Sequence, residues 1–269
     1  MERKFVKVEK GLGPDGRIAV VRFDRGDNIN ALSHQAMREL RDVPRDFEDD
    51  LETSVVILTG SAKAFSAGFD LKDPDGRARD LLSVGERVNR QRLGPRMCKA
   101  WQDMDQVTIA AIEGHCIGGG AALVVALDFR FCGQSAHFRI PEVELGMNMS
   151  WGSIPRMLAL MGPARTKQAV ILASDRIGAA EALEWRLVEK VVEDGAVLAA
   201  AMDFAGRIAR QPPIPVRMTK STVNRLAHAL DDLAAHMDAD QNVLTGLTED
   251  YKEGTSAFRE KRKPSFKGR

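Results

Sequence analysis

Short, nearly continuous apolar runs alternate along the chain with longer stretches in which apolar residues recur every three or four positions. The runs at residues 55–60 and 107–112 consist mainly of aliphatic residues. Such runs are typical of strands in a parallel sheet that helices cover on both faces. Further strands are predicted at residues 5–9, 17–23, 128–132, 137–140 and 188–192.

Helical spacing appears between these strands. Ser33 is a typical N-cap residue for a helix with Met37, Leu40, Val43, Phe47 and Leu51 on one face, and Pro44 is expected to bend that helix. Residues 77–104 predict a charged helix with the broken apolar pattern of a lid. Two more helices are expected to begin near Ser153 and Pro163.

The last third of the chain contains helical patterns alone. Residues 195–263 predict successive helices, with a break at Pro212, Pro213 and Pro215. The whole order predicts an α/β core of βα repeats at residues 1–195 and a C-terminal helical region at residues 196–269. A chain of 269 residues is long enough to bury a substantial core.

Composition narrows the class of partner. The net charge of +1 points to neither nucleic acid nor an anionic membrane as the main partner. The cysteines Cys98, Cys116 and Cys132 are odd in number and lack metal-binding spacing, which favours a reducing, cytoplasmic compartment. The first residues lack the apolar segment of a signal peptide, and no apolar run is long enough to span a membrane.

Common catalytic motifs do not reveal the function of this chain. The sequence contains no G-x-S-x-G, H-E-x-x-H or Walker A motif, and its five histidines lack ligand spacing, so a metal site is not expected. Residues 11–16 match G-x-G-x-x-G literally. However, the match contains the turn signature Pro-Asp-Gly and precedes a strand, whereas a dinucleotide site opens a helix. We therefore expect a hairpin there.

Two glycine-bearing turns each follow a predicted buried strand, at residues 67–70 and 118–120. In a parallel sheet both turns would lie at the carboxyl edge, where α/β proteins form their sites. Two backbone N–H groups that converge on one oxygen make an oxyanion hole. The alternative is that the glycines only permit close packing.

A carboxylate follows a later apolar strand, at Pro141-Glu142. Partial burial would raise the pKa of Glu142 and suit it to act as a general base. Glu144 is a competing candidate, because the two side chains would share a face of an extended segment. A surface glutamate in an ion pair is the alternative for either residue.

Several motifs, in this order, closely resemble the crotonase family, the enoyl-CoA hydratase/isomerase superfamily. They are Asn30-Ala31-Leu32-Ser33, the strand at 55–60, Ala64-Phe65-Ser66-Ala67-Gly68-Phe69-Asp70-Leu71, Gly118-Gly119-Gly120, Pro141-Glu142-Val143-Glu144-Leu145-Gly146, the segment 181–195, and the segments 249–254 and 257–262. Together they span nearly the whole chain.

The resemblance implies a spiral of ββα units, with C-terminal helices that build homotrimers, often stacked into hexamers. It implies an acyl-CoA thioester substrate whose oxygen sits between the backbone N–H groups of Phe69 and Gly119. No metal or redox cofactor is implied, because coenzyme A is part of the substrate. Positions that match CoA contacts are Ala64, Phe65, Ala67, Gly68, Asp70, Leu71, Phe258 and Lys261, the last two often from an adjacent subunit, with Lys63 and Lys72 as further candidates.

The sequence departs from the hydratase pattern at one catalytic carboxylate. Hydratases carry two glutamates; one matches Glu142, but Ala122 stands in the place of the other. Moving a double bond needs only one proton shuttle, so the pattern favours a Δ3,Δ2-enoyl-CoA isomerase that uses Glu142. The alternatives are a hydratase with one Glu, helped by Ser150 or an ordered water, another crotonase-type hydrolase or lyase, and a CoA-binding assembly protein without chemistry. Ser150 and Trp151 are candidates for the acyl pocket.

Overall fold

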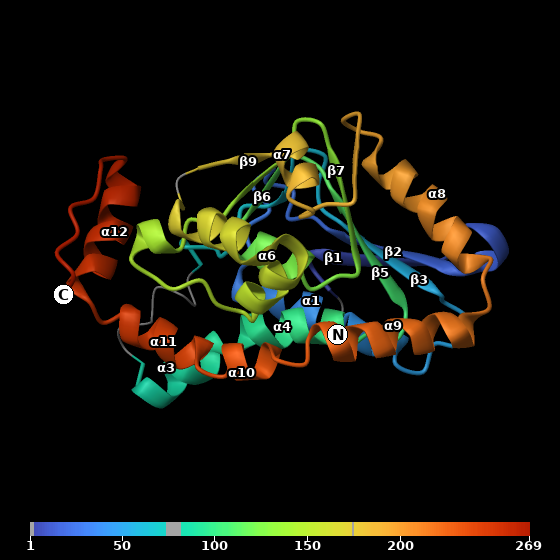
Figure 1. Cartoon of the computed structure of the whole chain (residues 1–269), viewed down its shortest axis with the longest axis horizontal. Coiled ribbons are helices and arrows are strands. Elements are labelled where there is room, and N and C mark those ends of the chain that lie inside the picture. Colours follow the sequence, from blue (N-terminus) through green and yellow to red (C-terminus); the bar gives the residue numbers. More distant parts are fainter. Residues whose placement is uncertain (1–2, 74–81, 174) are drawn as a thin grey trace.

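The computed structural model describes residues 3–73, 82–173 and 175–269 and contains two sheets surrounded by helices (Figure 1). The large sheet has the strand order β1 (Val6–Leu12), β2 (Ile18–Phe23), β3 (Val55–Thr59), β5 (Val107–Ile112), β7 (Phe129–Gly133) and β10 (Lys190–Val192). Strands β1 and β2 are antiparallel, and the remaining neighbours are parallel. All the strands predicted for this sheet are therefore present.

The large sheet is covered on both faces, as its apolar strands predict. Alternate residues of a strand point to opposite faces. Ile57 and Ile109 pack with helix α8 (Val197–Ala209) on one face. Leu58 and Ala110 belong to the core on the other face, which also includes residues of α1 (His34–Asp42) and α4 (Leu93–Gln102). Helix α8 thus packs directly on the sheet.

The second sheet was not predicted as a separate sheet, although one of its strands was. It has the order β4 (Ala64–Ser66), β6 (His115–Ile117), β8 (His137–Arg139) and β9 (Ile177–Gly178), with β4, β6 and β8 parallel. Strand β8 matches the strand predicted at 137–140, whereas only turns were expected at 67–70 and 118–120, beside β4 and β6. Strands β4, β6 and β9 have two or three residues, too few to show an alternating pattern, so the sequence carried little signal for them.

The N-terminal features follow their predicted local chemistry. The Ser33 Oγ atom accepts a hydrogen bond from the Ala36 N–H and caps α1. A 3₁₀ turn, η1 (Pro14–Gly16), joins β1 to β2, so the glycine motif at 11–16 forms a hairpin and does not open a helix. After α1, Pro44 begins a separate 3₁₀ turn, η2 (Pro44–Phe47).

The prediction of a lid at 77–104 is wrong for α4. Leu93, Met97 and Trp101, spaced four residues apart, are buried, and the Trp101 Nε1–H donates to the Leu40 carbonyl at 2.9 Å. The charged residues among them obscured this stripe. Helix α3 (Val84–Gln91) buries none of its residues. Residues 77–81 of the predicted segment lie outside the described residues.

The chain after residue 195 is helical, as predicted, and helices also dominate residues 153–184. Gly162 (φ 73°) kinks α6 at the expected second start, Pro163, and the proline-rich break separates α8 from α9. No helix in the described part of the chain is long and apolar enough to cross a membrane. Besides α8, the described helices from residue 119 onward are α5 (Gly119–Val124), η4 (Val143–Leu145), α6 (Ser153–Ile171), α7 (Ala179–Glu184), α9 (Pro213–Ala227), α10 (Asp231–Ala235), α11 (Asp238–Thr245) and α12 (Glu249–Glu260).

Polar side chains attach α9 to the core. Lys220 is nearly fully buried, and its Nζ atom lies 2.7 Å from Asp128 Oδ2 and 2.6 Å from the Gln106 carbonyl oxygen. Burial lowers the pKa of Lys220. The Asp128 carboxylate also accepts the Thr108 N–H at 2.7 Å. This pair therefore joins α9 to the start of β5 through desolvated groups.

We expect Lys220→Ala to lower the free energy of unfolding by about 3 kcal/mol, because it leaves the Asp128 carboxylate without its cation in a desolvated place. Urea unfolding measures the loss, and hydrogen exchange locates it in α9. Lys99→Ala is the matched control, since Lys99 forms an exposed pair with Asp103 at 2.5 Å and should cost less than about 1 kcal/mol. Equal effects of the two variants would contradict this assignment.

Candidate active site

The two predicted glycine turns meet at the ends of neighbouring strands. Strands β4 and β6 are parallel, with Ser66 paired to Cys116, so residues 67–70 and 118–120 leave the same edge of the small sheet. Gly68 has φ +82°, and a Cβ atom there would lie 2.6 Å from the Ile117 carbonyl oxygen and 3.3 Å from the Gly119 nitrogen. Only glycine fits this contact.

The amides of Phe69 and Gly119 are left without acceptors in these turns. The Gly68 N–H donates to Ser66 Oγ at 3.1 Å, the Asp70 N–H to the Leu32 carbonyl at 3.1 Å, and the Gly118 N–H to the Arg139 carbonyl at 2.9 Å. Among the residues that the structure describes, the Phe69 and Gly119 N–H groups have no hydrogen-bond acceptor. Donors of this kind can stabilise an oxyanion.

Polar contacts hold the Phe69 turn. The Leu32 N–H donates to the Gly68 carbonyl at 2.7 Å. Arg25 Nη1 donates to Asp70 Oδ2 at 2.7 Å and to the Ala31 carbonyl at 2.9 Å. Asp70 itself accepts the Lys72 N–H at 2.9 Å. The contact between Arg25 and Asp70 could not be predicted from the sequence, because the two residues are far apart in the chain.

The Phe69 ring is also supported from α1. The His34 ring meets it edge-on, with centroids 5.6 Å apart. Asp73 accepts the His34 backbone N–H at 2.6 Å and lies 2.8 Å from its Nδ1 atom. Both His34 and Asp73 are buried. The turn is therefore fixed on two sides before any ligand binds.

The Glu142 carboxylate lies against the second glycine turn. A Cβ atom on Gly118 would lie 2.6 Å from Glu142 Oε1. The residue as a whole is partly exposed, but its Oε2 atom is buried and has no hydrogen-bond partner among the described residues. Burial raises the pKa of Glu142 to about 7. A carboxylate in this state can both accept and return a proton near neutral pH.

Glu144 is placed differently. The segment is not extended: the Leu145 N–H donates to the Pro141 carbonyl at 3.2 Å, and the 3₁₀ turn η4 ends at Gly146 with φ 73°. The expectation that Glu142 and Glu144 share a face is therefore wrong. Glu144 forms an ion pair with Arg139, and its side chain is 35% exposed. This is the ion-paired alternative, realised at one of the two candidates.

Helix α12 packs on the turn that carries Glu142. A Cβ atom on Gly146 would lie 2.7 Å from the Asp250 carbonyl oxygen, and one on Gly254 would lie 2.7 Å from the Leu145 carbonyl carbon. The C-terminal region therefore fixes η4 through close backbone contacts. Phe258 and Lys261 lie at the exposed end of the same helix, and their contact with CoA stays a prediction.

The residues predicted to contact CoA lie mainly in and after β4. The side chains of Ala64 and Phe65 are buried, so only their backbone groups could face a ligand. Leu71 is 45% exposed, and Lys63 and Lys72 are exposed as well. Ala67, Gly68 and Asp70 belong to the Phe69 turn. The structure thus places one group of these residues together, and their role in binding stays a prediction.

The two acyl-pocket candidates lie on the chain between η4 and α6. The Ser150 carbonyl accepts the Ser153 hydroxyl at 2.6 Å. Trp151 has φ +65°, and its indole ring covers Gly119. Sequence analysis missed Gly94 of α4, which lies against the same ring. In the described ranges, no group of His, Cys, Asp and Glu side chains could hold a metal ion.

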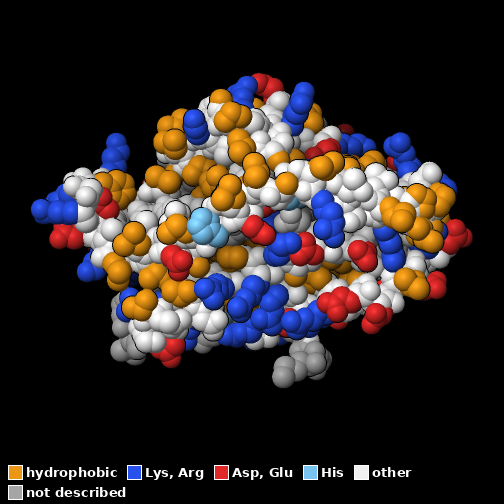
Figure 2. Space-filling view, turned by 60° about the horizontal axis from the view of Figure 1, so that its bottom comes forward, with side chains coloured by type: hydrophobic (Ala, Val, Ile, Leu, Met, Phe, Trp, Pro, Cys, Tyr) orange, Lys and Arg blue, Asp and Glu red, His pale blue; other side chains and the backbone are white. Residues whose placement is uncertain are grey.

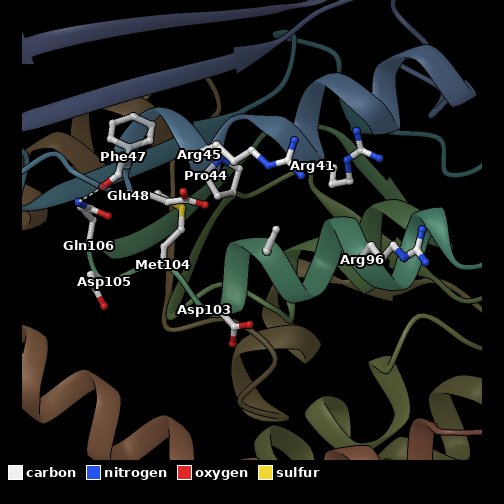
Figure 3. Close-up of a pocket in the computed structure, with 11 residues that line it drawn as sticks. Arg41, Pro44, Arg45, Phe47, Glu48, Arg96, Asp103, Met104, Asp105 and Gln106 are labelled. Carbon is white, nitrogen blue, oxygen red and sulfur yellow. Dashed lines mark hydrogen bonds between the residues drawn. The ribbon is translucent and has the colours of Figure 1, made fainter.

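An open cavity of about 570 Å³ lies elsewhere, between α4 and the α1–η2 segment (Figure 3). None of the predicted site residues lines it. Figure 2 shows lysine and arginine side chains gathered in the lower central part of one face of the molecule. The charged residues that line the cavity are Arg41, Arg45, Glu48, Arg96, Asp103 and Asp105.

Comparison with known proteins agrees with this fold and site. The family profile described as Enoyl-CoA hydratase/isomerase matches residues 14–269. The chain is 34% identical to a crotonyl-CoA hydratase of Syntrophomonas wolfei, over 95% of this chain and 96% of that protein. It is 32% identical to a short-chain-enoyl-CoA hydratase of Clostridium acetobutylicum, over 100% of both chains.

Solved structures show the same fold. An enoyl-CoA hydratase from Mycobacterium avium subsp. paratuberculosis superimposes with a TM-score of 0.85 at 22% identity, covering 99% of this chain and 100% of that one. An enoyl-CoA hydratase from Bacillus anthracis gives a TM-score of 0.76 at 30% identity, covering 99% and 100%. The chain therefore belongs to the enoyl-CoA hydratase/isomerase family, the crotonases, and has their fold.

Proposed function

We propose that this enzyme is an enoyl-CoA hydratase that adds water to the double bond of a 2-enoyl-CoA thioester with one carboxylate, that of Glu142. The observation that carries the proposal is the buried, unpartnered Glu142 Oε2 atom, on a carboxylate that touches Gly118, next to the free Gly119 N–H. The relatives named above are hydratases, which favours hydration over the isomerisation that the sequence alone suggested.

The oxygen of the thioester is bound by the Phe69 and Gly119 N–H groups in this proposal. When water attacks the β carbon, electrons move through the α carbon to that oxygen and form an enolate. Fixed N–H donors stabilise this charge more than they stabilise the uncharged thioester, and so they lower the barrier. Gly68 matters because it lets the two turns approach, and Gly118 matters because it lets the Glu142 carboxylate approach the second turn.

Glu142 handles the proton in both halves of the reaction. The ionised carboxylate takes a proton from water as the water oxygen bonds to the β carbon. The same carboxyl group then returns the proton to the α carbon, and the enolate collapses to the thioester. The net change is a hydroxyl on the β carbon and a hydrogen on the α carbon, with Glu142 restored. Ala122 supplies no second carboxylate.

A Δ3,Δ2-enoyl-CoA isomerase is the second candidate, and Ala122 favours it. Here Glu142 removes a proton from the α carbon of a 3-enoyl-CoA and returns it to the γ carbon. Both reactions share the enolate and the two N–H donors. They differ in whether oxygen from the solvent enters the product.

We expect Glu142→Gln to lower the turnover of crotonyl-CoA to 3-hydroxybutyryl-CoA at least about 100-fold, because the amide can neither accept nor return the proton. Product analysis in ¹⁸O-labelled water identifies hydration, and 3-hexenoyl-CoA tests isomerisation in parallel. Glu144→Gln is the matched control, since Glu144 lies in the same turn but pairs with Arg139. Full activity of Glu142→Gln would refute the mechanism, and label-free conversion of 3-hexenoyl-CoA alone would select the isomerase.

The rate should depend on the ionisation of Glu142. Burial raises its pKa to about 7, so the fraction of active carboxylate falls as the pH drops below that value. We expect kcat/KM to decrease about tenfold per pH unit on the acid side and to level off above it. The pH profile with crotonyl-CoA measures this limb. A limb near the ordinary pKa of a glutamate would show that the carboxylate is solvated in the working enzyme.

We also propose that the enzyme forms homotrimers or hexamers through its C-terminal helices, with Phe258 and Lys261 reaching CoA bound mainly by residues 64–71 of a neighbouring copy. Helix α9 docks on the core through polar groups, such as the Arg217 guanidinium, which donates to the Thr53 carbonyl at 3.1 Å. Helix α9 and the adjoining segment with α10 leave large apolar side chains exposed, and an exposed row of this kind marks an interaction surface. The row comprises Ile214 (69% exposed), Met218 (66%), Leu226 (77%), Leu230 (70%) and Leu233 (71%).

We expect the double substitution Leu226→Asp and Leu230→Asp to reduce the mass in light scattering to that of one 29.6 kDa chain, because charged groups cannot be buried between subunits. The KM for crotonyl-CoA should rise at the same time. Leu51→Asp is the control, since Leu51 is 73% exposed but lies outside this row. A monomeric wild-type protein, or an unchanged mass in the double variant, would refute the proposed surface.

A further inference from the structure

We infer that Trp151 sets the length of the acyl group by filling the space beside Gly119, so that the substrates are short-chain acyl-CoA thioesters. This inference rests on the proposed function, because it takes the Phe69 and Gly119 amides as the place of the thioester oxygen. It adds a residue that determines specificity and names the class of acyl group. Three observations about Trp151 support it.

The first observation is the place of the indole ring. A Cβ atom on Gly119 would lie 2.6 Å from the ring atoms Cη2 and Cζ3 of Trp151. A Cβ atom on Gly94 would lie 2.1 Å from Cε2 of the same ring. The ring therefore spans from α4 to the first residue of α5, and glycine at both ends makes room for it. The Leu32 side chain borders the same space, because its Cδ1 atom would lie 3.3 Å from a Cβ atom on Gly119.

The second observation is the backbone of Trp151. Its φ of +65° lies in the left-handed region that large side chains rarely adopt. The Trp151 carbonyl accepts a hydrogen bond from Arg156 Nη1 at 2.8 Å, and the next amide, Gly152 N–H, donates to Asp238 Oδ2 at 2.7 Å. Strained residues held by their surroundings cluster at functional sites.

The third observation is that the residues holding Trp151 are themselves fixed. Arg156 is buried, and its Nε–H donates to Gln102 Oε1 at 3.0 Å. Asp238 of α11 is also buried. Groups from α4, α6 and α11 thus fix the backbone that carries the ring. A satisfied network of buried polar groups makes a structure rigid, so the ring resists displacement by a ligand.

The position of the ring relative to Glu142 explains its effect on the substrate. The carboxylate lies against Gly118 and the indole against Gly119, so the two side chains flank consecutive residues of one turn. An acyl chain that starts at the Gly119 N–H has its first carbons beside Glu142. Further extension toward α4 meets the indole, which lies against both Gly119 and Gly94.

Trp151→Gly tests the wall, because glycine adopts φ +65° without strain and removes the whole ring. We expect the ratio of kcat/KM for 2-dodecenoyl-CoA to that for crotonyl-CoA to rise at least about tenfold, since one extra methylene in an apolar pocket already changes selectivity by about that factor. Trp151→Phe, which keeps a smaller ring, should give an intermediate ratio. Using a ratio removes any general loss of activity.

Arg186→Gly is the matched control. Arg186 is exposed and has φ +63°, so this variant makes the same backbone change outside the site, and its ratio should equal that of the wild-type enzyme. An unchanged ratio in active Trp151→Gly would overturn the inference.

A binding measurement separates this inference from the proposed function. Calorimetry with the saturated thioesters butyryl-CoA and lauroyl-CoA needs no chemistry. We expect Trp151→Gly to lower the Kd for lauroyl-CoA, relative to the Kd for butyryl-CoA, at least about tenfold. If the wild-type protein converts no enoyl-CoA but this shift appears, the proposed function fails and the wall stands. If the wild-type enzyme hydrates crotonyl-CoA and no shift appears, the wall fails and the proposed function stands.

Discussion

The site depends on one desolvated carboxylate. Glu142 keeps Oε2 buried without a hydrogen-bond partner among the described residues, and burial raises its pKa to about 7 from an ordinary value of 4.5. This difference corresponds to about 3 kcal/mol between the two protonation states. Because the folded protein holds the proton more tightly than the unfolded chain, its stability declines as the pH rises from about 4.5 to about 7. At neutral pH the rest of the fold must compensate for this loss.

The surrounding fold compensates through close backbone packing. Gly118 lets the carboxylate approach, and Gly146 and Gly254 let α12 pack on the turn that carries it. In the other glycine turn, Arg25 Nη1 donates a hydrogen bond to Asp70 Oδ2 at 2.7 Å and so holds the turn that carries Phe69. The contacts that fix the site therefore come from segments that are distant in the sequence. A flexible segment at any of these points would let the carboxylate turn toward water, and its pKa would then return to the ordinary value.

Much of the fold and part of the site could be predicted from the sequence, for reasons that are local. Residues that are close in the sequence determine the buried strands, the Ser33 cap, the Pro-Asp-Gly hairpin and the two glycine turns. The small sheet was missed because Ala64–Ser66 and His115–Ile117 are too short for a pattern. The difference between Glu142 and Glu144 depends on the turn ended by Gly146 and on Arg139, which a strand-like interpretation of the segment hid.

The absence of a second carboxylate at Ala122 changes how water must be held. Ala122 is fully buried in the core. Its methyl group has no donor or acceptor, so it offers a water molecule no hydrogen bond. In the proposed hydration, a water that attacks the β carbon must then be oriented by Glu142 itself, and the same group must afterwards carry its proton to the α carbon. One carboxylate thus performs the positioning and both proton transfers. In the proposed site the indole of Trp151, which lies against Gly119 and Gly94, would keep the acyl carbons beside Glu142, because a chain that cannot extend toward α4 holds its first carbons against the turn. Confinement of the substrate in this way supplies orientation that a second acidic group would otherwise provide.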